Sequence, residues 1–452
     1  MLDAPLAILL ASLALVALHG TSRAQSLEEA LVSTYLTNPQ LEAQRAALRA
    51  TDELVPQALS DWRPTITAGG SATHSDIDSS ARQGTLDTLS SSLTLDQQIY
   101  SGGETVANTD RAERLVRAER ARLMAVEQDT LFNGVQAYTT LLTDLAVLDF
   151  ASQNESRLRR QLQATRDRFE VGEVTRTDVA QAEASLAGAV AARVQAEGNI
   201  LASRAAFRSI INLEPVKLIT PKPLSDLPAT EDGAQQIAGE INPNIAAAEF
   251  DLAAARAEVR IAEAALLPRL SVRGEFTYTD EPSFQLDWER DASIGANLSV
   301  PLYQGGGEYA RVRQSKQTVR QRQDDLEAAL RNVREETTAA WQALTTARTR
   351  IQSISEQVRA AEIAVEGSRQ EALVGQRTVL DVLDQEQDLF QAQVDLVGAQ
   401  RDQIIASYRL KAAVGQLTAA DIGLPVEPYE AEAYYSDVRN RLIGLGPQLK
   451  GR

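Results

Sequence analysis

The chain has 452 residues, a formal net charge of −17 and no cysteine. The lack of cysteine excludes disulfide bonds, thiolate metal ligands and cysteine catalysis. The acidic balance argues against nucleic acid as a partner, because binding to phosphates needs a basic face. Aromatic residues make up only 5% of the chain, and its many Ala, Gln and Arg residues favour long helices over a large globular core.

The amino-terminal residues have the pattern of an export signal. An apolar run ends in small residues, and Ser22 and Ala24 occupy the −3 and −1 positions of a cleavage site before Gln25. The run is too short for a comfortable membrane span, although it follows Asp3 and lacks the usual basic residue. We therefore expect a cleaved signal peptide over residues 1–24, in preference to a retained anchor, and an exported mature chain.

The remainder of the chain is a duplicated module. Three landmarks recur in the same order, 204, 203 and 203 residues apart: Asn-Pro at Asn38 and Asn242, a tyrosine near a double glycine at Tyr100 and Tyr303, and a valine–glycine turn at Val171 and Val374. These constant offsets predict a first repeat over residues 25–221 and a second over residues 222–417. Two copies are too few for a solenoid, so each repeat is expected to be one structural unit.

Both repeats are expected to begin with a short helix and to continue with strands. Asn38 and Asn242 can each cap a helix whose first position is proline. Apolar and polar residues then alternate between turn-rich loops, more cleanly in the second repeat than in the first. This period of two predicts β-hairpins over residues 64–100 and 268–303.

After the double glycine the apolar period changes to steps of three and four. In the second repeat this heptad seam runs unbroken from Leu326 to Val365. The valine–glycine turn then reverses the chain, which predicts long antiparallel helical hairpins over residues 105–212 and 308–415. The returning helix and the Asn-Pro helix together match the length of the long outgoing helix, as expected for an antiparallel bundle.

Four strands are too few to close a barrel, and an open sheet with unpaired edges cannot lie in lipid. Outer-membrane barrels have at least eight strands, so two or three copies of the chain would be needed to supply eight or twelve. Many heptad positions hold Ala or Thr, and one protomer therefore buries little apolar area by itself. We expect an oligomer that shares one barrel, with a trimer preferred.

The duplication, "LPRLSV", "LYQGGG" and the stretch that begins "VGQRTVLDVLDQEQDLF" together resemble the TolC family of outer-membrane efflux and type I secretion channels. The resemblance implies a mainly α-helical fold with a small β part. Long antiparallel helical hairpins would form an α-barrel, and four strands per chain would contribute to a shared, trimeric, twelve-stranded transmembrane β-barrel. The implied location is the outer membrane, with a large portion in the periplasm.

The resemblance also implies partners and cargo. Members of the family export secreted proteins or small toxic compounds by joining an inner-membrane ABC or proton-driven pump through a periplasmic adaptor protein. The expected partners are therefore two further copies of the chain, the adaptor, the pump and outer-membrane lipid, without nucleic acid and without a cofactor. The sequence leaves protein secretion and drug efflux both open, and the acidic lumen and the lack of a cysteine for a lipid anchor favour secretion only slightly.

Val171, Gly172, Val374 and Gly375 are expected at the periplasmic tips of the two hairpins. Each glycine has a plain role, since glycine after the last helical turn lets the chain reverse. That role leaves the valine beside each glycine unexplained. In family members similar tips meet the adaptor, so the resemblance makes these four residues candidates for adaptor contact.

Asp381 and Asp384 lie three residues apart on one predicted helix and share a face. By themselves they would be a solvated face, the usual place of exposed carboxylates. In the family, the matching pair faces the lumen at its narrowest point, where a trimer would have a cation-selective ring of six carboxylates. The resemblance therefore assigns the pore constriction to Asp381 and Asp384.

Arg377 matches a family arginine that links the inner hairpin to a threonine on the neighbouring hairpin, here Thr177, and keeps the pore closed at rest. Asp178, in the same region, normally receives a tyrosine from the other hairpin. Ala372 occupies the position of that tyrosine here. The resemblance thus predicts gate links through Arg377, Thr177 and Asp178, the last without its usual partner.

Sequence motifs for catalysis and for metal binding are missing. The double glycines lack the Lys-Ser/Thr of a phosphate loop, His74 has no partner histidine, and no Ser-His-Asp set can be assembled. We therefore expect no enzyme, no cofactor and no metal site. The tail over residues 418–452 leaves both the repeat and the heptad pattern, and either wraps the middle of the tunnel or is disordered.

Two other functions compete with the export duct. A soluble periplasmic coiled-coil tether or adaptor would explain the heptads, but it leaves the alternating hairpins at matching places in both repeats unexplained. An enzyme that acts on the cell wall would need a catalytic set of residues. Location in the soluble periplasm would favour the tether, and location in the outer membrane would favour the duct.

Overall fold

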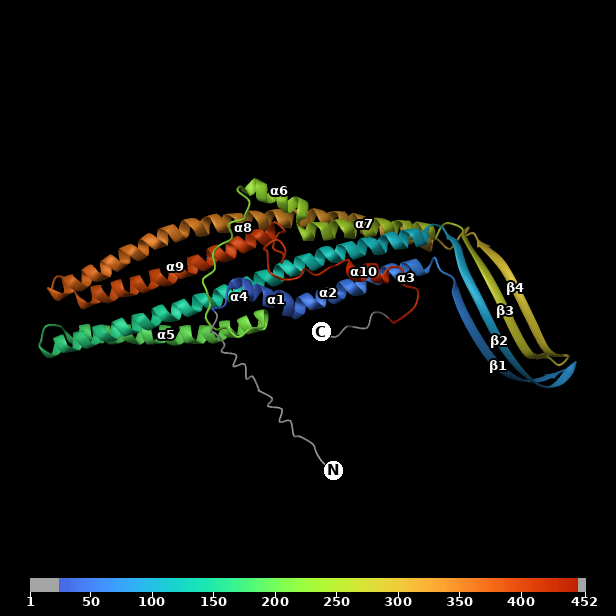
Figure 1. The fold of residues 1–452 in the computed structure, drawn as a ribbon, viewed down its shortest axis with the longest axis horizontal. Helices are drawn as coiled ribbons and strands as arrows, with labels where there is room; N and C mark the ends of the chain where they lie inside the picture. The colour runs from blue at the N-terminus through green and yellow to red at the C-terminus, as the bar shows by residue number, and fades with distance from the viewer. Residues whose placement is uncertain (1–23, 446–452) are drawn as a thin grey trace, which may run out of the picture.

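The computed structural model describes residues 24–445. The predicted signal peptide lies outside this range except for Ala24, and so does the end of the tail, residues 446–452. The described part of the molecule is elongated, with a bundle of long helices at one end and a β-sheet at the other (Figure 1).

Four antiparallel strands form the sheet, in the order β1-β2-β3-β4. Their bounds are β1 Thr65–Ser79, β2 Arg82–Ser101, β3 Arg269–Ser283 and β4 Leu286–Ser299. β2 of the first repeat pairs with β3 of the second in a register that places Leu93 opposite Phe276, so the two hairpins form one curved sheet (Figure 1). β1 and β4 are its edges, and neither has a further neighbour among residues 24–445.

Two long helices of equal length dominate the bundle. α4 spans Glu104–Glu170 and α8 spans Gly307–Leu373, 67 residues each, which corresponds to roughly 100 Å at 1.5 Å per residue. Each returns through a tight turn into a helix about half as long, α5 over Arg176–Ile211 and α9 over Val379–Ala413. The predicted combination of long antiparallel helical hairpins with four strands is confirmed.

Shorter helices lie beside the half of the bundle that is nearer the sheet. They are α1 Leu27–Thr37, α2 Pro39–Asp52, α3 Leu54–Ser60, α6 Glu231–Ile241 and α7 Pro243–Ala264. Asn38 and Asn242 cap α2 and α7, because the side-chain oxygen of each accepts a hydrogen bond of 2.9 Å from the backbone N–H two residues on. α7 packs against both α4 and α8 and so connects the two repeats (Figure 1).

The largest apolar core lies in the middle of the bundle, between the half nearer the sheet and the half that ends in the tight turns. Tyr138 is fully buried there, and its hydroxyl donates to the carbonyl of Gln25 at 2.7 Å and accepts from the N–H of Ile219 at 2.9 Å. Leu417 and Leu424, which follow the last long helix, belong to the same core. The chain beyond α9 therefore packs into the centre of the molecule.

The described part of the tail continues along the first repeat to α10, Ala433–Val438 (Figure 1). Tyr434 donates from its hydroxyl to Glu53 Oε1 at 2.7 Å, and Arg439 donates to Glu113 Oε1 at 2.9 Å. These contacts attach the tail to α4 and to the junction of α2 and α3.

Asp52, at the end of α2, is a fully buried carboxyl. Neither of its oxygens has a hydrogen-bond partner among residues 24–445. Burial raises the pKa of Asp52 to about 6, although Arg120 nearby attracts the charged form and opposes this shift. The fold therefore places Asp52 in surroundings that disfavour its ionised form.

Asp52→Asn is expected to stabilise the protein at neutral pH but not in acid. The folded chain keeps the Asp52 proton up to about pH 6, whereas the unfolded chain loses it near pH 3.8. Asp52 therefore favours folding at low pH, and this contribution to stability is lost as the pH rises through 6. Above that pH the buried charge costs about 3 kcal/mol, which asparagine avoids.

Thermal unfolding of the parent and of Asp52→Asn in detergent, from pH 4 to pH 8, measures this effect. The exposed Asp61 lies close by at the end of α3, and Asp61→Asn is the matched control with no change expected. A difference in melting temperature between Asp52→Asn and the parent that is the same at pH 4 and at pH 8 would contradict the prediction.

Candidate functional site

Both hairpins end in the same tight turn, at the end of the bundle farthest from the sheet (Figure 1). The turn residues Gly172 and Gly375 have φ angles of 82° and 79°, a left-handed conformation that glycine adopts without steric cost. In each turn the N–H after the glycine donates to the carbonyl five residues back, at 2.9 Å. The two glycines therefore have a structural role, and a side chain at either position would strain the turn.

Apolar side chains are exposed at both tips. Val171 is 72% exposed and Val374 is 71% exposed, and Phe169 and Leu373 near them are also exposed. Reversal of the chain needs the glycine but no valine, so local folding does not explain these side chains. Exposed apolar residues gathered at the end of a polar bundle are typical of a surface that a partner covers.

Asp178 and Asp381 have a role that the sequence analysis missed, because each completes the amino-terminal cap of a helix. Asp381 Oδ2 accepts hydrogen bonds from Thr378 N at 2.9 Å and from the Thr378 hydroxyl at 2.7 Å. Asp178 Oδ2 accepts the same two bonds from Thr175, at 2.7 Å and 2.8 Å. The signal was present in the sequence as Thr-x-x-Asp shortly after each glycine turn.

The two aspartates of α9 differ in their surroundings. The Thr378 hydroxyl and N–H hold the pKa of the Asp381 carboxyl below its usual value, so this group stays ionised at neutral and mildly acidic pH. Asp384, three residues on, is exposed. The first hairpin has Gln181 at the equivalent position, 203 residues earlier. Asp384 is therefore a carboxylate that the first hairpin lacks at this position.

Arg377 pairs across its own turn, where its Nε donates to Glu371 Oε2 at 2.7 Å. Within residues 24–445, no hydrogen bond joins Arg377 to Thr177 or to Asp178. Thr177 is exposed, and Ala372, at the position of the expected tyrosine, is buried. In one protomer Arg377 thus contacts Glu371, and the gate links to the neighbouring hairpin stay a prediction.

The two hairpins touch along an apolar strip near the tips. Leu158 and Leu162 of α4 and Ala182 of α5 lie in one buried cluster with Val379 and Leu383 of α9. The cluster joins the first repeat to the second at the level of the aspartates of α9. Since these side chains are buried within a single chain, the contact does not depend on a second copy.

Glu386, one helical turn beyond Leu383, is a second feature that the sequence analysis missed. Its side chain is only 4% exposed, and it forms ion pairs with Arg157 of α4 and Arg369 of α8. In the sequence it is one of many charged residues on a heptad helix, and nothing local marks it as buried.

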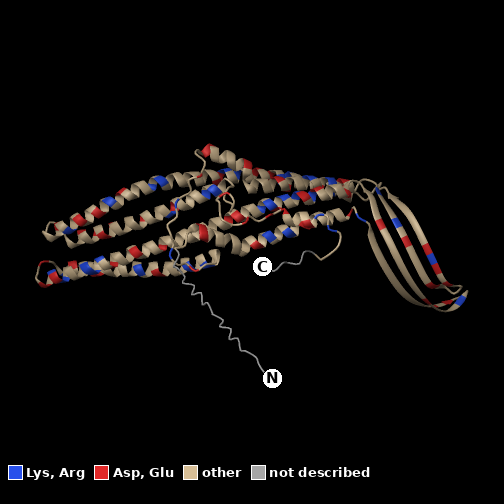
Figure 2. Cartoon of the chain, viewed as in Figure 1, with Lys and Arg blue, Asp and Glu red and all other residues tan. Residues whose placement is uncertain are grey.

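The sheet has two chemically different faces, because successive side chains of a strand point to opposite sides. One row across the four strands is apolar: Ala68, Leu93, Phe276 and Ala292. The adjacent row, on the opposite face, is polar: Thr67, Thr94, Glu275 and Ser293. The polar face also has an ion pair, in which Arg273 Nε donates to Asp96 Oδ1 at 2.8 Å, and charged residues are visible along the strands in Figure 2.

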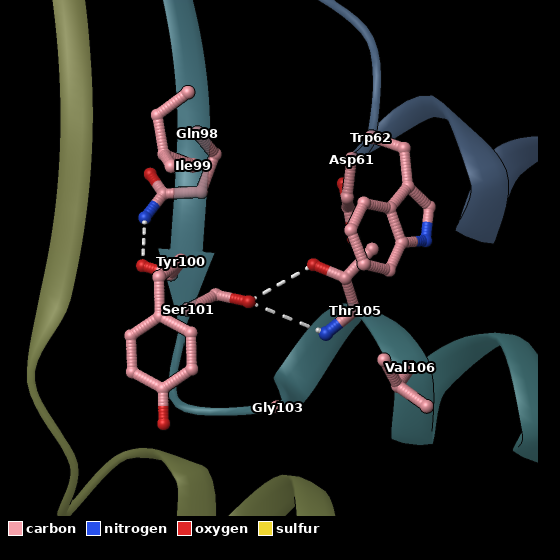
Figure 3. Close-up of a pocket in the computed structure, with 9 residues that line it drawn as sticks. All are labelled: Asp61, Trp62, Gln98, Ile99, Tyr100, Ser101, Gly103, Thr105 and Val106. Atoms are coloured by element: carbon pink, nitrogen blue, oxygen red, sulfur yellow. Dashed lines mark hydrogen bonds between the residues drawn. The ribbon is translucent and has the colours of Figure 1, made fainter.

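A hollow lies where β2 passes into α4, between Trp62 and Tyr100 (Figure 3). Ser101 Oγ lies 3.0 Å from Thr105 Oγ1 and connects the end of the strand to the first turn of the helix. Gly102 is needed there, because a Cβ at this position would lie 2.7 Å from the carbonyl oxygen of Ala264. The hollow is therefore explained as the junction between the sheet and the bundle.

In the part of the chain that the structure describes, no helix is both long enough and apolar enough to cross a membrane. The same residues contain no group of three or more side chains placed to hold a metal ion. His74 lies on the sheet, with its Nδ1 2.5 Å from Asp87 Oδ1.

Comparison with known proteins gives consistent matches over nearly the whole chain. A family model described as "Outer membrane efflux protein" matches residues 30–213 and 235–416. Outer membrane efflux protein BepC of Brucella suis is 33% identical, over 93% of this chain and 92% of its own length. Outer membrane protein TolC of Vibrio cholerae is 30% identical, over 92% and 96%. The solved structure of the Campylobacter jejuni CmeC outer membrane channel superposes with a TM-score of 0.80 at 16% identity, covering 92% of this chain and 89% of that one.

Proposed function

The chain belongs to the outer membrane efflux protein family, and from this we propose that three copies assemble into one export duct. Proteins of this family are transport conduits, so the chain is an outer-membrane export channel and not an enzyme. The observation that carries the proposed assembly is the four-stranded sheet, which has one apolar face, one polar face and two edges that are unpaired within residues 24–445.

The unpaired edges support an assembly in which β4 of one copy pairs with β1 of the next. Three copies would close a barrel of twelve strands and leave no edge, which a sheet in lipid requires. The apolar face, with Leu93 and Phe276, would contact lipid. The polar face, with Glu275 and Arg273, would line a water-filled passage. A soluble tether would have no use for this division of faces.

The helical hairpins would extend from the barrel across the periplasm. A helix of 67 residues is roughly 100 Å long, which would place the tips far from the outer membrane. There the exposed Val171 and Val374, each beside its turn glycine, Gly172 or Gly375, would meet a periplasmic adaptor that connects the duct to an inner-membrane pump. The pump, of the ABC or the proton-driven type, would select the cargo, either secreted proteins or small toxic compounds.

The narrowest point of the duct would lie near the tips. Three copies of Asp381 and Asp384 would form a ring of six carboxylates, and the low pKa of Asp381 keeps its share of the ring charged. In the closed state Arg377 would reach Thr177 and Asp178 of the neighbouring hairpin, in exchange for its contact with Glu371. Such a ring would pass cations and bind divalent ions.

A pair of adjacent substitutions in β3 tests the barrel. Phe276→Lys is expected to lower the amount of protein in the outer membrane severalfold, because a lysine on the lipid face of a barrel costs roughly 2–4 kcal/mol at the bilayer centre. Thr277→Lys, the next residue, places the same charge on the polar face and is the matched control, with outer-membrane levels near those of the parent.

Membrane fractionation followed by immunoblotting measures both variants. Parent protein that is released with the soluble periplasm by osmotic shock would contradict the duct and favour the tether. Equal losses from Phe276→Lys and Thr277→Lys would contradict the assignment of the two faces.

A further inference from the structure

The two hairpins contain the same arginine–glutamate pair. In the first hairpin Arg166 of α4 pairs with Glu183 of α5 at 2.6 Å, and in the second Arg369 of α8 pairs with Glu386 of α9. The partners are 17 residues apart in both cases, and the two pairs are offset by 203 residues, like the rest of the repeat. The second pair is therefore the duplicate of the first.

The surroundings of the two pairs differ sharply. The side chains of Arg166 and Glu183 are each 50% exposed, whereas that of Glu386 is 4% exposed. A buried carboxylate is costly unless it is well paired, and the first hairpin supplies a second cation. Arg157 Nε of α4 lies 2.9 Å from Glu386 Oε2. In the second repeat the duplicated pair has become a contact between hairpins.

We infer that Glu386 clamps the second hairpin to the first in the resting channel, and that the channel opens by separating Arg157 from Glu386. This inference rests on the proposed export function. Glu386 lies two residues beyond Asp384 on the same helix, on its buried side, while Asp384 is exposed. A rotation of α9 that carries Asp384 out of the passage would therefore also turn Glu386 out of its contact with Arg157 of α4.

The three-residue arrangement makes this clamp releasable. When Arg157 separates, Arg369 stays with Glu386, because both belong to the second hairpin and move together. The carboxylate is never left without a cation, and opening costs one of its two ion pairs. The clamp also supplies a link between hairpins in a protein that has Ala372 where a hydroxyl-bearing link residue was expected.

Single-channel recording in planar bilayers tests the clamp on the purified full-length protein. Arg157→Gln leaves the Arg369–Glu386 pair in place and removes only the contact between hairpins. We expect Arg157→Gln and Glu386→Gln each to raise the resting conductance by roughly twofold or more, as a widened constriction would, and the double variant to add little. Arg157→Lys, which keeps the charge, is expected to stay near the parent.

Glu183→Gln is the matched control, since it breaks the equivalent exposed pair of the first hairpin and is expected to leave the conductance unchanged. If Arg157→Gln and Glu386→Gln reach parent levels in the outer membrane and still conduct more than the parent, a purely structural role of the Arg157–Glu386 pair is contradicted. The clamp is overturned if Arg157→Gln conducts like the parent, or if Glu183→Gln raises the conductance as much as Glu386→Gln. A parent protein that forms no channels would refute the proposed function instead.

Should Glu386→Gln fail to assemble, Arg157→Gln and Arg157→Lys decide the question by themselves. A higher conductance in the glutamine variant than in the lysine variant supports the clamp, and equal conductance of the two contradicts it.

Discussion

Replacing Asp381 and Asp384 together by asparagine is expected to abolish both the cation preference of the channel and its block by divalent cations. In the proposed trimer the change removes six negative charges from one ring. Each charge near a hydrated ion contributes about 1 kcal/mol, so the Mg²⁺ concentration for half block should rise by at least roughly tenfold. Asparagine can still accept the hydrogen bond from Thr378, so the cap of α9 is largely kept.

Reversal potentials in a salt gradient and titration with Mg²⁺ in planar bilayers give the two measurements. Asp167→Asn is the control, because Asp167 is an exposed carboxylate of α4 close to the other tip, and it should leave selectivity and block unchanged. Retention of Mg²⁺ block in the double variant would refute the assignment of the constriction, and the pair would then be a solvated face with Asp381 serving as a cap.

Val171→Asp combined with Val374→Asp is expected to abolish export while the channel itself still forms. Both side chains are more than 70% exposed, so the folded protomer loses almost no packing. A partner that buries them would lose roughly 1.5 kcal/mol or more per valine and would have to desolvate a charge in each. With three copies the losses are repeated around the ring, which is enough to disrupt docking.

Survival of cells on a toxic compound, or secretion of a reporter protein, measures export, and planar bilayers show whether the purified variant still conducts. Val216→Asp is the matched control, since Val216 is also exposed but lies in the loop after α5, away from the tips. Unimpaired export by the double variant would exclude the valines from adaptor contact, and loss of conductance would show that the substitutions damage the channel.

The periodicity of the chain predicted the four strands and the long helices, whereas α1, α6 and α10 were not predicted. A period of two predicted strands because one face of the sheet is apolar and the other polar. In the observed register the pair Leu93 and Phe276 lies on one face, and the pair Thr94 and Glu275 lies on the other. Steps of three and four predicted helices because one side of such a helix is apolar and the other is polar. These patterns depend only on residues that are close in the sequence, so they predict the same elements whatever the rest of the chain is.

The roles of single charged residues were harder to predict. Asp381 was assigned to the pore from a resemblance, and its capping bonds with Thr378 were overlooked although Thr-x-x-Asp is a local signal. Within the protomer the Arg377 side chain contacts Glu371 across its own turn, and its link to the neighbouring hairpin stays a prediction. Long flexible side chains have several partners within reach, and the choice among them depends on packing.

The duplicated pairs show most clearly what the sequence by itself determined. The offset of 203 residues established two equivalent hairpins, and the spacing of 17 residues across each turn brings an arginine and a glutamate together in both. Only the tertiary structure decided that Glu183 remains at the surface while Glu386 is buried against Arg157. Burial is created when α9 packs on α4, a contact between segments more than two hundred residues apart, and no local pattern specifies it.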